Sequence, residues 1–400
     1  MEEWKQFRLI DVLDTLIDYR GKTPKKTTSG VPLITAKVIK NGRIDSPSEF
    51  ISLDDYDSWM VRGFPKVGDV VLTTEAPLGE VAQLKDANIA LAQRVVTLRG
   101  KSGVLDNTYL KYYFLSNVGQ QRLKARETGT TVTGIKQSEL REVLVDVPPY
   151  EIQVGISKVL KSLDDKIELN RKINANLEAQ AQALFKSWFV DFEPFKDQPF
   201  VESELGMIPE GWKVGNIYEY IDVIYGAPYK SSLFNEDKDG LPLIRIRDLK
   251  TNAPQFYTPE LLPNTEYINA GDIVAGMDAE FIPYVWLGER GVLNQRCCKF
   301  KGKNDAISNY YILFLIKPEL EYVQSYKTGT TVSHLGKSDI DRFKLMTPPL
   351  DVVLAFSERV NPMKEEVVNR AKESRRLASL RDTLLPRLMS GELKVNEIVL

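Results

Sequence analysis

The sequence predicts an α+β protein in which one unit occurs twice, each copy being a globular domain followed by a long helix. Three observations support this: a collinear internal repeat, short apolar runs separated by turns in each globular part, and a long apolar stripe at helical spacing after each Pro-Pro pair. The expected segments are a first globular domain at 1–149, a long helix at 150–191, a linker at 192–200, a second globular domain at 201–348 and a second long helix at 349–400.

The internal repeat is clearest at the end of each globular domain, where Thr-Gly-Thr-Thr-Val at 128–132 recurs at 328–332. Earlier matching positions are Trp4 and Trp212, Gly30 and Gly240, Gly68-Asp69 and Gly271-Asp272, and Gln93-Arg94 and Gln295-Arg296. The order is the same in both halves, and the offsets run 208, 210, 203, 202 and 200. Because solenoid repeats are only about 20 to 50 residues long, each copy should be a domain with its own core.

The globular domains are expected to contain short strands, for example at 70–73 and 95–98, because these β-branched runs lie between Gly, Pro and Asp turns. A short tyrosine-rich helix is expected near the end of each domain, at 109–115 and 310–316, with the Gly-Thr-Thr turn after it.

The segments after the two Pro-Pro pairs are predicted to be long helices, because apolar residues fall three and four apart from 152 to about 190 and again at positions offset by 200. The first would be roughly 58 Å long at about 1.5 Å per residue. We expect the two stripes to pack on each other as an antiparallel pair. Pro362 should kink or restart the second helix, and Pro386 should end or bend its last turns.

Two asparagines lie in the apolar stripe of the first helix, and the offset of 200 places Asn170 opposite Arg370 and Asn174 opposite Ser374. Either these asparagines are buried between the two helices and fix their register, or the apolar stripe rotates away from the helix interface and leaves them in solvent. The linker that follows contains Pro194 and Pro199, which predict a stiff, extended segment.

Composition indicates a soluble protein, with 43% hydrophobic residues and a net charge of −2. No apolar run approaches the roughly 18 to 20 residues that span a bilayer, and the start lacks the features of a signal peptide, so we expect a cytoplasmic protein and no membrane contact. Cys297 and Cys298 are adjacent and match no zinc spacing, so both are expected to be partly buried.

Residues 19–44 contain seven basic residues and no acidic one, which predicts either a solvated loop or contacts with a phosphate backbone. The corresponding residues 225–250 contain five basic and four acidic residues. The two domains therefore differ in surface chemistry.

Catalytic motifs are incomplete. The chain has a single histidine, His334, and Gly336-Lys337-Ser338 lacks the first glycine of a phosphate-binding loop. The Pro148-Pro149 pair resembles an amino-methyltransferase motif, but Val147 stands where Asn or Asp would bind the target amino group. We therefore expect no catalytic residue, no metal and no cofactor in this chain.

These features resemble the specificity subunit of a type I restriction and modification enzyme. The resemblance rests on the twofold repeat, the Thr-Gly-Thr-Thr-Val turns, the Pro-Pro starts of the helices and the stretch ELGMIPEGW at 204–212. It implies that each globular part is a target recognition domain for double-stranded DNA and that the antiparallel helices bind two methyltransferase subunits. Restriction subunits would complete the complex, and S-adenosylmethionine would belong to the methyltransferase.

The resemblance implies an asymmetric bipartite DNA target, and three kinds of contact are expected. Phosphate contacts are assigned to Lys22, Lys25, Lys26 and Lys230, and base contacts to Gln93, Arg94, Gln295, Arg296, Arg245 and Arg247. Thr130, Thr131, Thr330 and Thr331 would bind phosphates or cap the turn. Residues that are identical in both domains are better placed to hold the protein scaffold or the DNA backbone than to specify bases. The positions that differ, Thr35 and Lys37 in the first domain and Arg245 and Arg247 in the second, are therefore the stronger base-reading candidates.

The expected partner contacts on the helices are Trp188, Phe189, Leu384 and Leu388. Two other functions stay open at this point. One is an adenine methyltransferase fused to a recognition domain, and the other is a coiled-coil adaptor without DNA affinity.

Overall fold

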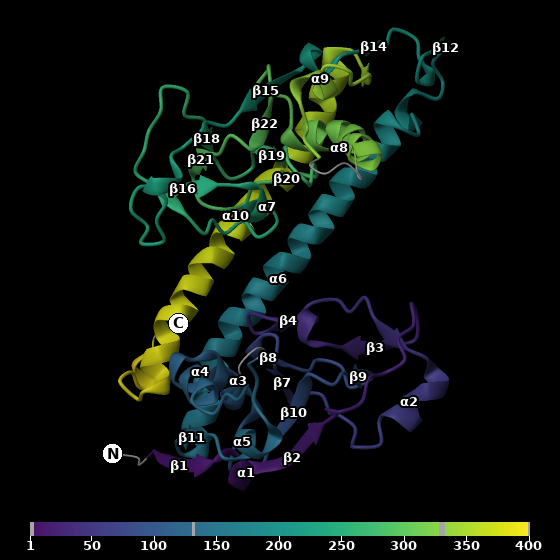
Figure 1. The fold of residues 1–400 in the computed structure, drawn as a ribbon. Helices are drawn as coiled ribbons and strands as arrows, with labels where there is room; N and C mark the ends of the chain where they lie inside the picture. The colour runs from purple at the N-terminus through teal and green to yellow at the C-terminus, as the bar shows by residue number, and fades with distance from the viewer. Residues whose placement is uncertain (1–3, 130–132, 328–332, 399–400) are drawn as a thin grey trace. The chain divides into compact units, whose positions relative to one another are not determined.

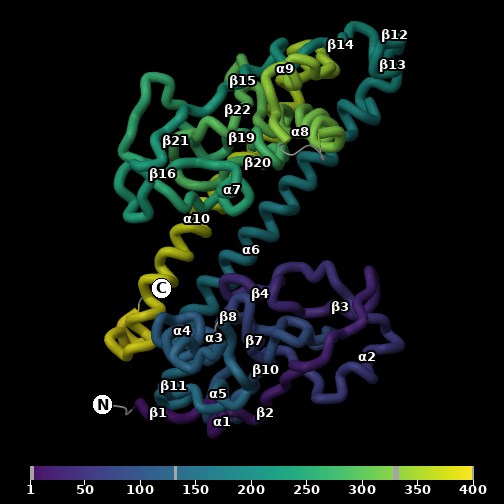
Figure 2. The backbone as a smooth tube through the Cα atoms, viewed as in Figure 1, coloured from purple at the N-terminus to yellow at the C-terminus, as the bar shows by residue number. Residues whose placement is uncertain are grey.

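The computed structural model describes residues 4–129, 133–327 and 333–398. The chain divides into two compact units, residues 1–166 with 377–400, and residues 167–376. Each unit contains one globular domain and part of the two long helices, α6 (Tyr150–Phe189) and α10 (Leu350–Met389), which Figures 1 and 2 show in teal and yellow.

The first domain is built on a four-stranded antiparallel sheet of order β2-β10-β7-β8, formed by β2 (Leu13–Asp18), β10 (Val95–Gly100), β7 (Val70–Thr74) and β8 (Leu78–Gln83). A smaller sheet has the order β6-β3-β9, in which Leu33 and Ile34 pair in parallel with Ala90 and Leu91. The remaining elements are β1 (Lys5–Arg8), α1 (Leu9–Val12), β3 (Val31–Ile34), β4 (Ile39–Lys40), β5 (Arg43–Ile44), β6 (Phe50–Ile51), α2 (Leu53–Trp59), β9 (Ala90–Leu91), α3 (Asn107–Leu115), α4 (Asn117–Lys124), α5 (Gln137–Arg141) and β11 (Leu144–Val147).

The second domain repeats this topology. Its main sheet has the order β15-β22-β19-β20, and its smaller sheet again contains a parallel pair, in which Leu243 and Ile244 pair with Val292 and Leu293. The elements are β12 (Phe200–Ser203), β13 (Gly206–Pro209), β14 (Lys213–Gly215), β15 (Ile221–Tyr225), β16 (Leu241–Ile244), α7 (Ile246–Leu249), β17 (Tyr257–Thr258), β18 (Tyr267–Ile268), β19 (Ile273–Gly276), β20 (Pro283–Val285), β21 (Gly291–Leu293), β22 (Cys297–Gly302), α8 (Asn309–Lys327), α9 (Lys337–Ile340) and β23 (Leu345–Thr347). The internal repeat predicted from the sequence is confirmed in the order of the main sheets and in the parallel pairs. The small sheet of the second domain has a fourth strand, β18, and the β4–β5 pair has no counterpart among the described strands.

The core of each unit joins its globular domain to both long helices. In the first unit, Leu160 of α6 and Leu388 of α10 are fully buried with Tyr109 of α3. In the second, Phe189 of α6 packs against Phe356 of α10, with ring centroids 5.0 Å apart. Burial of these apolar faces stabilises the long helices, because helical propensity alone contributes little.

The two long helices run antiparallel, as predicted. In the first unit, Asp164 of α6 pairs with Arg381 of α10. In the second, Asn170 Nδ2 donates to Glu373 at 2.7 Å, and Asn174 Nδ2 donates to the Val367 carbonyl at 3.2 Å. Asn170 is fully buried and also accepts from Arg370 Nη1 at 3.1 Å. Of the two alternatives for this asparagine, the structure selects the buried seam that fixes the register.

The expected interruption of the second helix at Pro362 is wrong, since α10 is continuous through both Pro362 and Pro386. A proline inside a helix costs about 3 kcal/mol. Val360 lies in the core before Pro362 and Val367 is fully buried after it, and this burial offsets the cost. The helix ends at Met389 rather than continuing to 400, because Gly391 has a φ of +72° and closes the C-terminal turn.

Three further expectations need correction. The linker is not extended: Glu193–Phe195 forms a short 3-10 turn, because Phe195 is buried against Trp212, with centroids 5.0 Å apart. The tyrosine-rich helix of the second domain, α8, runs to Lys327, because buried Leu320 and Val323 continue its apolar face. Cys297 and Cys298 are fully buried rather than partly buried, and burial raises the pKa of both thiols.

Candidate nucleic-acid interface

Four polar residues of the first domain come together where β3, β7 and β9 end and β10 begins. The Ala92 N–H donates to the Ile34 carbonyl at 3.0 Å, and the Thr74 N–H donates to the Arg94 carbonyl at 3.0 Å. These backbone bonds place the residues that follow each strand beside one another. We call Thr35, Glu75, Gln93 and Arg94 the first strand-end cluster.

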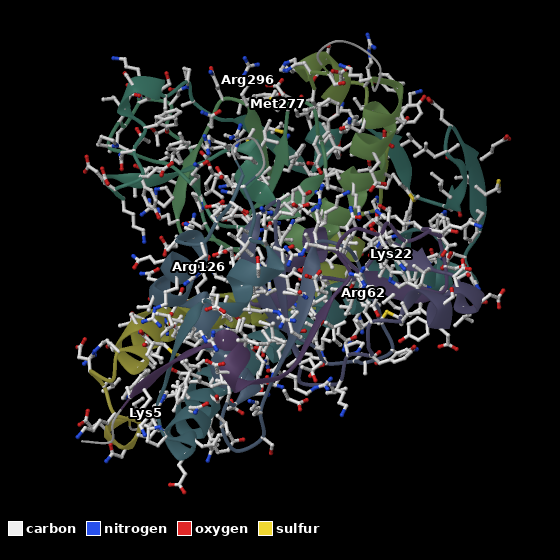
Figure 3. All side chains as sticks on the ribbon, turned by 60° about the horizontal axis from the view of Figure 1, so that its bottom comes forward. Lys5, Lys22, Arg62, Arg126, Met277 and Arg296 are labelled. Carbon is white, nitrogen blue, oxygen red and sulfur yellow. The ribbon has the colours of Figure 1, made fainter. Side chains whose placement is uncertain are left out.

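The second domain brings the corresponding residues together in the same way. The Asn294 N–H donates to the Ile244 carbonyl at 3.1 Å, and the Met277 N–H donates to the Arg296 carbonyl at 2.8 Å. Figure 3 shows Met277 beside Arg296. The second strand-end cluster consists of Arg245, Asp278, Gln295 and Arg296.

An equivalent ion pair lies in both clusters. Arg94 Nε lies 2.7 Å from Glu75 Oε1, and Arg296 Nη1 lies 3.2 Å from Asp278 Oδ2. The arginine side chains remain 48% and 58% exposed. Since a guanidinium group has five N–H donors, one carboxylate contact leaves donors for a phosphate group.

Sequence reasoning missed the two carboxylates, although a signal was present. Glu75 and Asp278 are both acidic and are separated by 203 residues, the same offset that separates Gly68 from Gly271. The carboxylates hold the two arginines that the sequence pointed to. Because an equivalent arginine-carboxylate pair occurs in both domains, the arrangement favours a role for these arginines in binding the DNA backbone over a role in distinguishing bases.

The cluster of each domain adjoins the start or end of its Thr-Gly-Thr-Thr-Val turn. In the first domain Glu75 forms a β-bridge with Gly134, and Thr128 hydrogen-bonds Gly134 in both directions, at 2.7 and 3.1 Å. In the second, Asp278 Oδ1 lies 2.7 Å from His334 Nδ1. The four candidate threonines of the turns, Thr130, Thr131, Thr330 and Thr331, lie outside the described residues.

The candidate phosphate contacts are mostly free at the surface. Within the described part of the chain, Lys22, Lys25 and Lys230 are exposed and their ammonium groups form no ion pair, and Figure 3 shows Lys22. Lys26 is also exposed, but its ammonium group lies 2.8 Å from Glu49 Oε1. Three of the four lysines therefore keep their charge available for a ligand.

Two of the four stronger base-reading candidates have little exposed surface in the structure. Thr35 follows β3 and is buried, with 9% of its surface exposed. Arg245 pairs with Asp248 at 3.3 Å and lies over the Phe256 ring at 4.3 Å, so its side chain is only 17% exposed. Lys37 and Arg247 are exposed and remain candidates.

Three of the four expected partner contacts on the long helices are buried within the chain. Phe189, Leu384 and Leu388 are 4%, 9% and 0% exposed. Phe189 of α6 fills the core of the second unit, and Leu384 and Leu388 of α10 fill the core of the first. Trp188 is partly buried under Arg359, whose guanidinium carbon lies 5.4 Å from the ring centroid. Trp188 is the one of these four residues that is not buried, and it stays a predicted partner contact.

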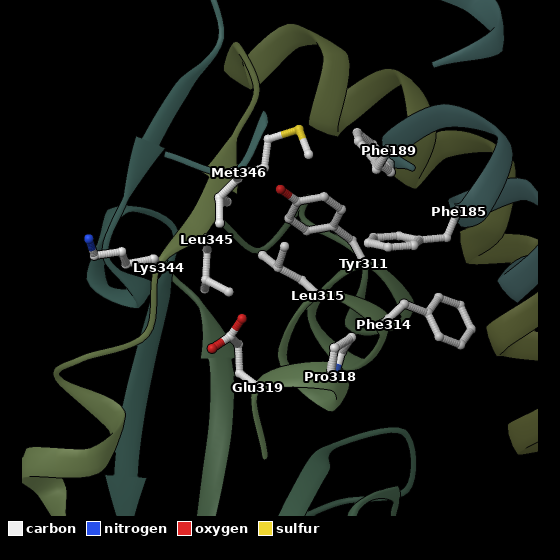
Figure 4. Close-up of a pocket in the computed structure, with 11 residues that line it drawn as sticks. Phe185, Phe189, Tyr311, Phe314, Leu315, Pro318, Glu319, Lys344, Leu345 and Met346 are labelled. Atoms are coloured by element: carbon white, nitrogen blue, oxygen red, sulfur yellow. The ribbon is translucent and has the colours of Figure 1, made fainter. Parts of the chain in front are cut away.

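An apolar pocket of about 160 Å³ lies in the second unit between α6, α8 and β23 (Figure 4). Phe185, Tyr311 and Leu315 form much of its wall, and burial raises the pKa of Glu319 at its rim. The described residues contain no group of three or more His, Cys, Asp or Glu side chains placed to hold a metal ion.

No helix in the described ranges has the length and hydropathy needed to cross a bilayer.

Comparison with known proteins agrees with the repeat and the fold. The family model described as "Type I restriction modification DNA specificity domain" matches residues 1–179 and 209–352. The type I restriction enzyme MjaIX specificity subunit of Methanocaldococcus jannaschii is 32% identical over 358 residues, covering 84% of this chain and 80% of the relative. The HindI specificity subunit of Haemophilus influenzae is 23% identical over 374 residues, covering 76% and 82%.

A solved structure supports the architecture. The crystal structure of the S subunit of a type I restriction-modification system from M. genitalium has a TM-score of 0.53 to this chain at 17% identity, and the match covers 96% of each chain. The two matches of the family model fall on the two copies of the repeat and take in most of both globular domains. The chain belongs to the type I restriction modification DNA specificity family.

Proposed function

We propose that this chain is the DNA specificity subunit of a type I restriction-modification complex, in which each globular domain binds one half of an asymmetric bipartite DNA target. The observation that carries the proposal is the pair of equivalent strand-end clusters, which contain the same arginine-carboxylate pair within different surroundings. Two domains that share a scaffold but differ in their exposed side chains are suited to binding DNA at two different base sequences.

The two kinds of exposed cation take different roles in this proposal. Arg94 and Arg296 contact phosphate groups, because a carboxylate at the equivalent position holds each of them in both domains. Lys37 and Arg247 differ between the domains and are exposed, so they contact base edges. Arginine and lysine both suit the O6 and N7 acceptors of guanine in the major groove.

The long helices set the separation of the two half-sites and bind methyltransferase subunits, and restriction subunits join the full complex. Methyl transfer and S-adenosylmethionine are assigned to the methyltransferase subunits. The alternative, an adenine methyltransferase fused to a recognition domain, is disfavoured because Val147 occupies the position before Pro148-Pro149 that needs a side-chain amide or carboxylate.

The proposal is tested by mapping methylated bases in the host genome with and without this gene. We expect an asymmetric motif of two specified halves, separated by unspecified base pairs, to lose its methylation when the gene is deleted. Unchanged methylation would contradict the proposal. Binding of S-adenosylmethionine to the purified chain without partners would favour the alternative.

A further inference from the structure

Residues 19–44 of the first domain carry five exposed cations that form no ion pair with any described residue: Lys22, Lys25, Lys37, Lys40 and Arg43. They come from the loop before β3, the turn after it, and the β4–β5 hairpin. The other two cations of this segment are already neutralised, since Arg20 pairs with Asp18 at 2.7 Å and Lys26 pairs with Glu49 at 2.8 Å. We call the five unpaired residues the cationic segment.

Nearby acidic residues do not neutralise the cationic segment. Glu80 approaches the β4–β5 hairpin, but its Oε2 accepts from the Asn41 N–H at 2.8 Å and pairs with neither Lys40 nor Arg43. The three aspartates of α2 likewise form no ion pair with the cationic segment. Five like charges without counter-ions repel one another and destabilise the domain on its own. A polyanionic ligand would relieve this repulsion and bind favourably to the cationic segment.

The corresponding residues 225–250 of the second domain have a different balance. Four cations are exposed and unpaired within the described ranges: Lys230, Lys238, Arg247 and Lys250. Three exposed carboxylates, Glu236, Asp237 and Asp239, accompany them in the same segment. Over the whole domains, basic residues outnumber acidic ones 21 to 19 in 1–149 but are outnumbered 20 to 16 in 201–348.

We infer that the first domain supplies most of the salt-dependent binding to the DNA phosphate backbone, whereas the second domain contributes comparatively little of it. This inference rests on the proposed function, because it assumes that both domains bind the same duplex. Each phosphate that a cation neutralises steepens the dependence of log Kobs on log salt by about 0.9. Because Lys37 is assigned to base edges, the other four cations of the cationic segment should account for a slope of about 3 to 4. Carboxylates beside the cations of the second domain reduce the share of that domain.

The test compares two variants of the full chain in complex with its methyltransferase subunits. The first replaces the five residues of the cationic segment by glutamine. The matched control replaces the four unpaired cations of 225–250 by glutamine. All nine side chains are exposed and without ion-pair partners, so both variants should keep the wild-type melting temperature. Binding to a duplex containing the methylated motif is measured at several salt concentrations.

We expect the first variant to lower the salt slope by about 3 to 4 and the control to lower it by less than half as much. An equal or larger effect of the control variant, or an unchanged slope in the first variant, would overturn the inference. Failure of the proposed function gives a different result, because the wild-type complex would then neither bind the duplex nor methylate it.

Discussion

Replacing Asp164 by asparagine removes a carboxylate that three donors share where the first domain meets the two long helices. Asp164 Oδ2 accepts from Lys111 Nζ at 2.8 Å and from the Tyr112 hydroxyl at 2.6 Å, and Oδ1 accepts from Arg381 Nη1 at 2.8 Å. The Lys111 side chain is only 8% exposed. Asparagine fills the same volume but leaves this ammonium group buried without a counter-ion.

The cost follows from that burial. Breaking a buried ion pair by removing one partner destabilises a protein by about 3 to 5 kcal/mol. Since Asp164 retains 21% exposure, we expect the lower end, about 3 kcal/mol, which corresponds to a fall in Tm of roughly 6 to 12 °C for a unit of this size. Differential scanning calorimetry of the full chain measures the shift.

The adjacent Asp165 provides the matched control. Its partner is Lys161, and both side chains are more than half exposed, so Asp165→Asn should cost less than about 1 kcal/mol. Combining Lys111→Met with Asp164→Asn should restore part of the lost stability, because no buried charge then lacks a partner. Equal melting temperatures for the Asp164→Asn and Asp165→Asn proteins would refute the reasoning.

Four other results are expected. Phe189→Ala lowers the unfolding free energy by about 3 to 5 kcal/mol in urea titrations, because the ring is buried among aromatic side chains; a loss below about 1 kcal/mol would contradict that packing. Asn170→Leu costs about 1 to 3 kcal/mol because its partly buried partners on α10 each lose a hydrogen bond, and a gain in Tm would argue against a register role. Burial opposes ionisation of Asp164, but its three donors hold its pKa below the ordinary 3.8. The stability that the Asp164 carboxylate contributes is therefore complete above pH 3.8 and is lost as the pH falls through the lower pKa of the folded state. The Asp164→Asn variant should lack this loss of stability in an acid titration. Arg94→Gln should weaken binding about equally on all DNA sequences, whereas an altered methylation motif would show that Arg94 reads bases.

The repeat and the long helices could be predicted from the sequence because both depend on patterns that one chain displays directly. The offset of 200 placed Asn170 opposite Arg370, which the structure confirms. The expected pairing of Asn174 with Ser374 is wrong, because antiparallel helices keep no constant offset and Ser374 lies beside Asn170 instead. The expected interruption at Pro362 was wrong because the local cost of a proline is outweighed by tertiary packing on either side. The compact linker was missed for the same reason, since burial of Phe195 overrides the extended preference of the prolines around it.

The candidate site was only partly predictable. Arg94 and Arg296 were found through the repeat, and the structure adds their carboxylate partners. Thr35 and Arg245 were chosen because they differ between the copies, but composition does not reveal that one is buried and the other is held by Asp248. Residue type alone cannot distinguish an apolar side chain that docks a partner from one that fills the core, and the sequence did not show that Leu388 is fully buried in the first unit.

The most direct test of the central claim is to exchange the first domain, residues 1–149, for that of a family member with a different target and to sequence the methylated bases of the host genome. If each domain binds one half-site, one half of the motif will change while the other half and the gap stay the same. A motif in which both halves change, or neither does, would contradict the account.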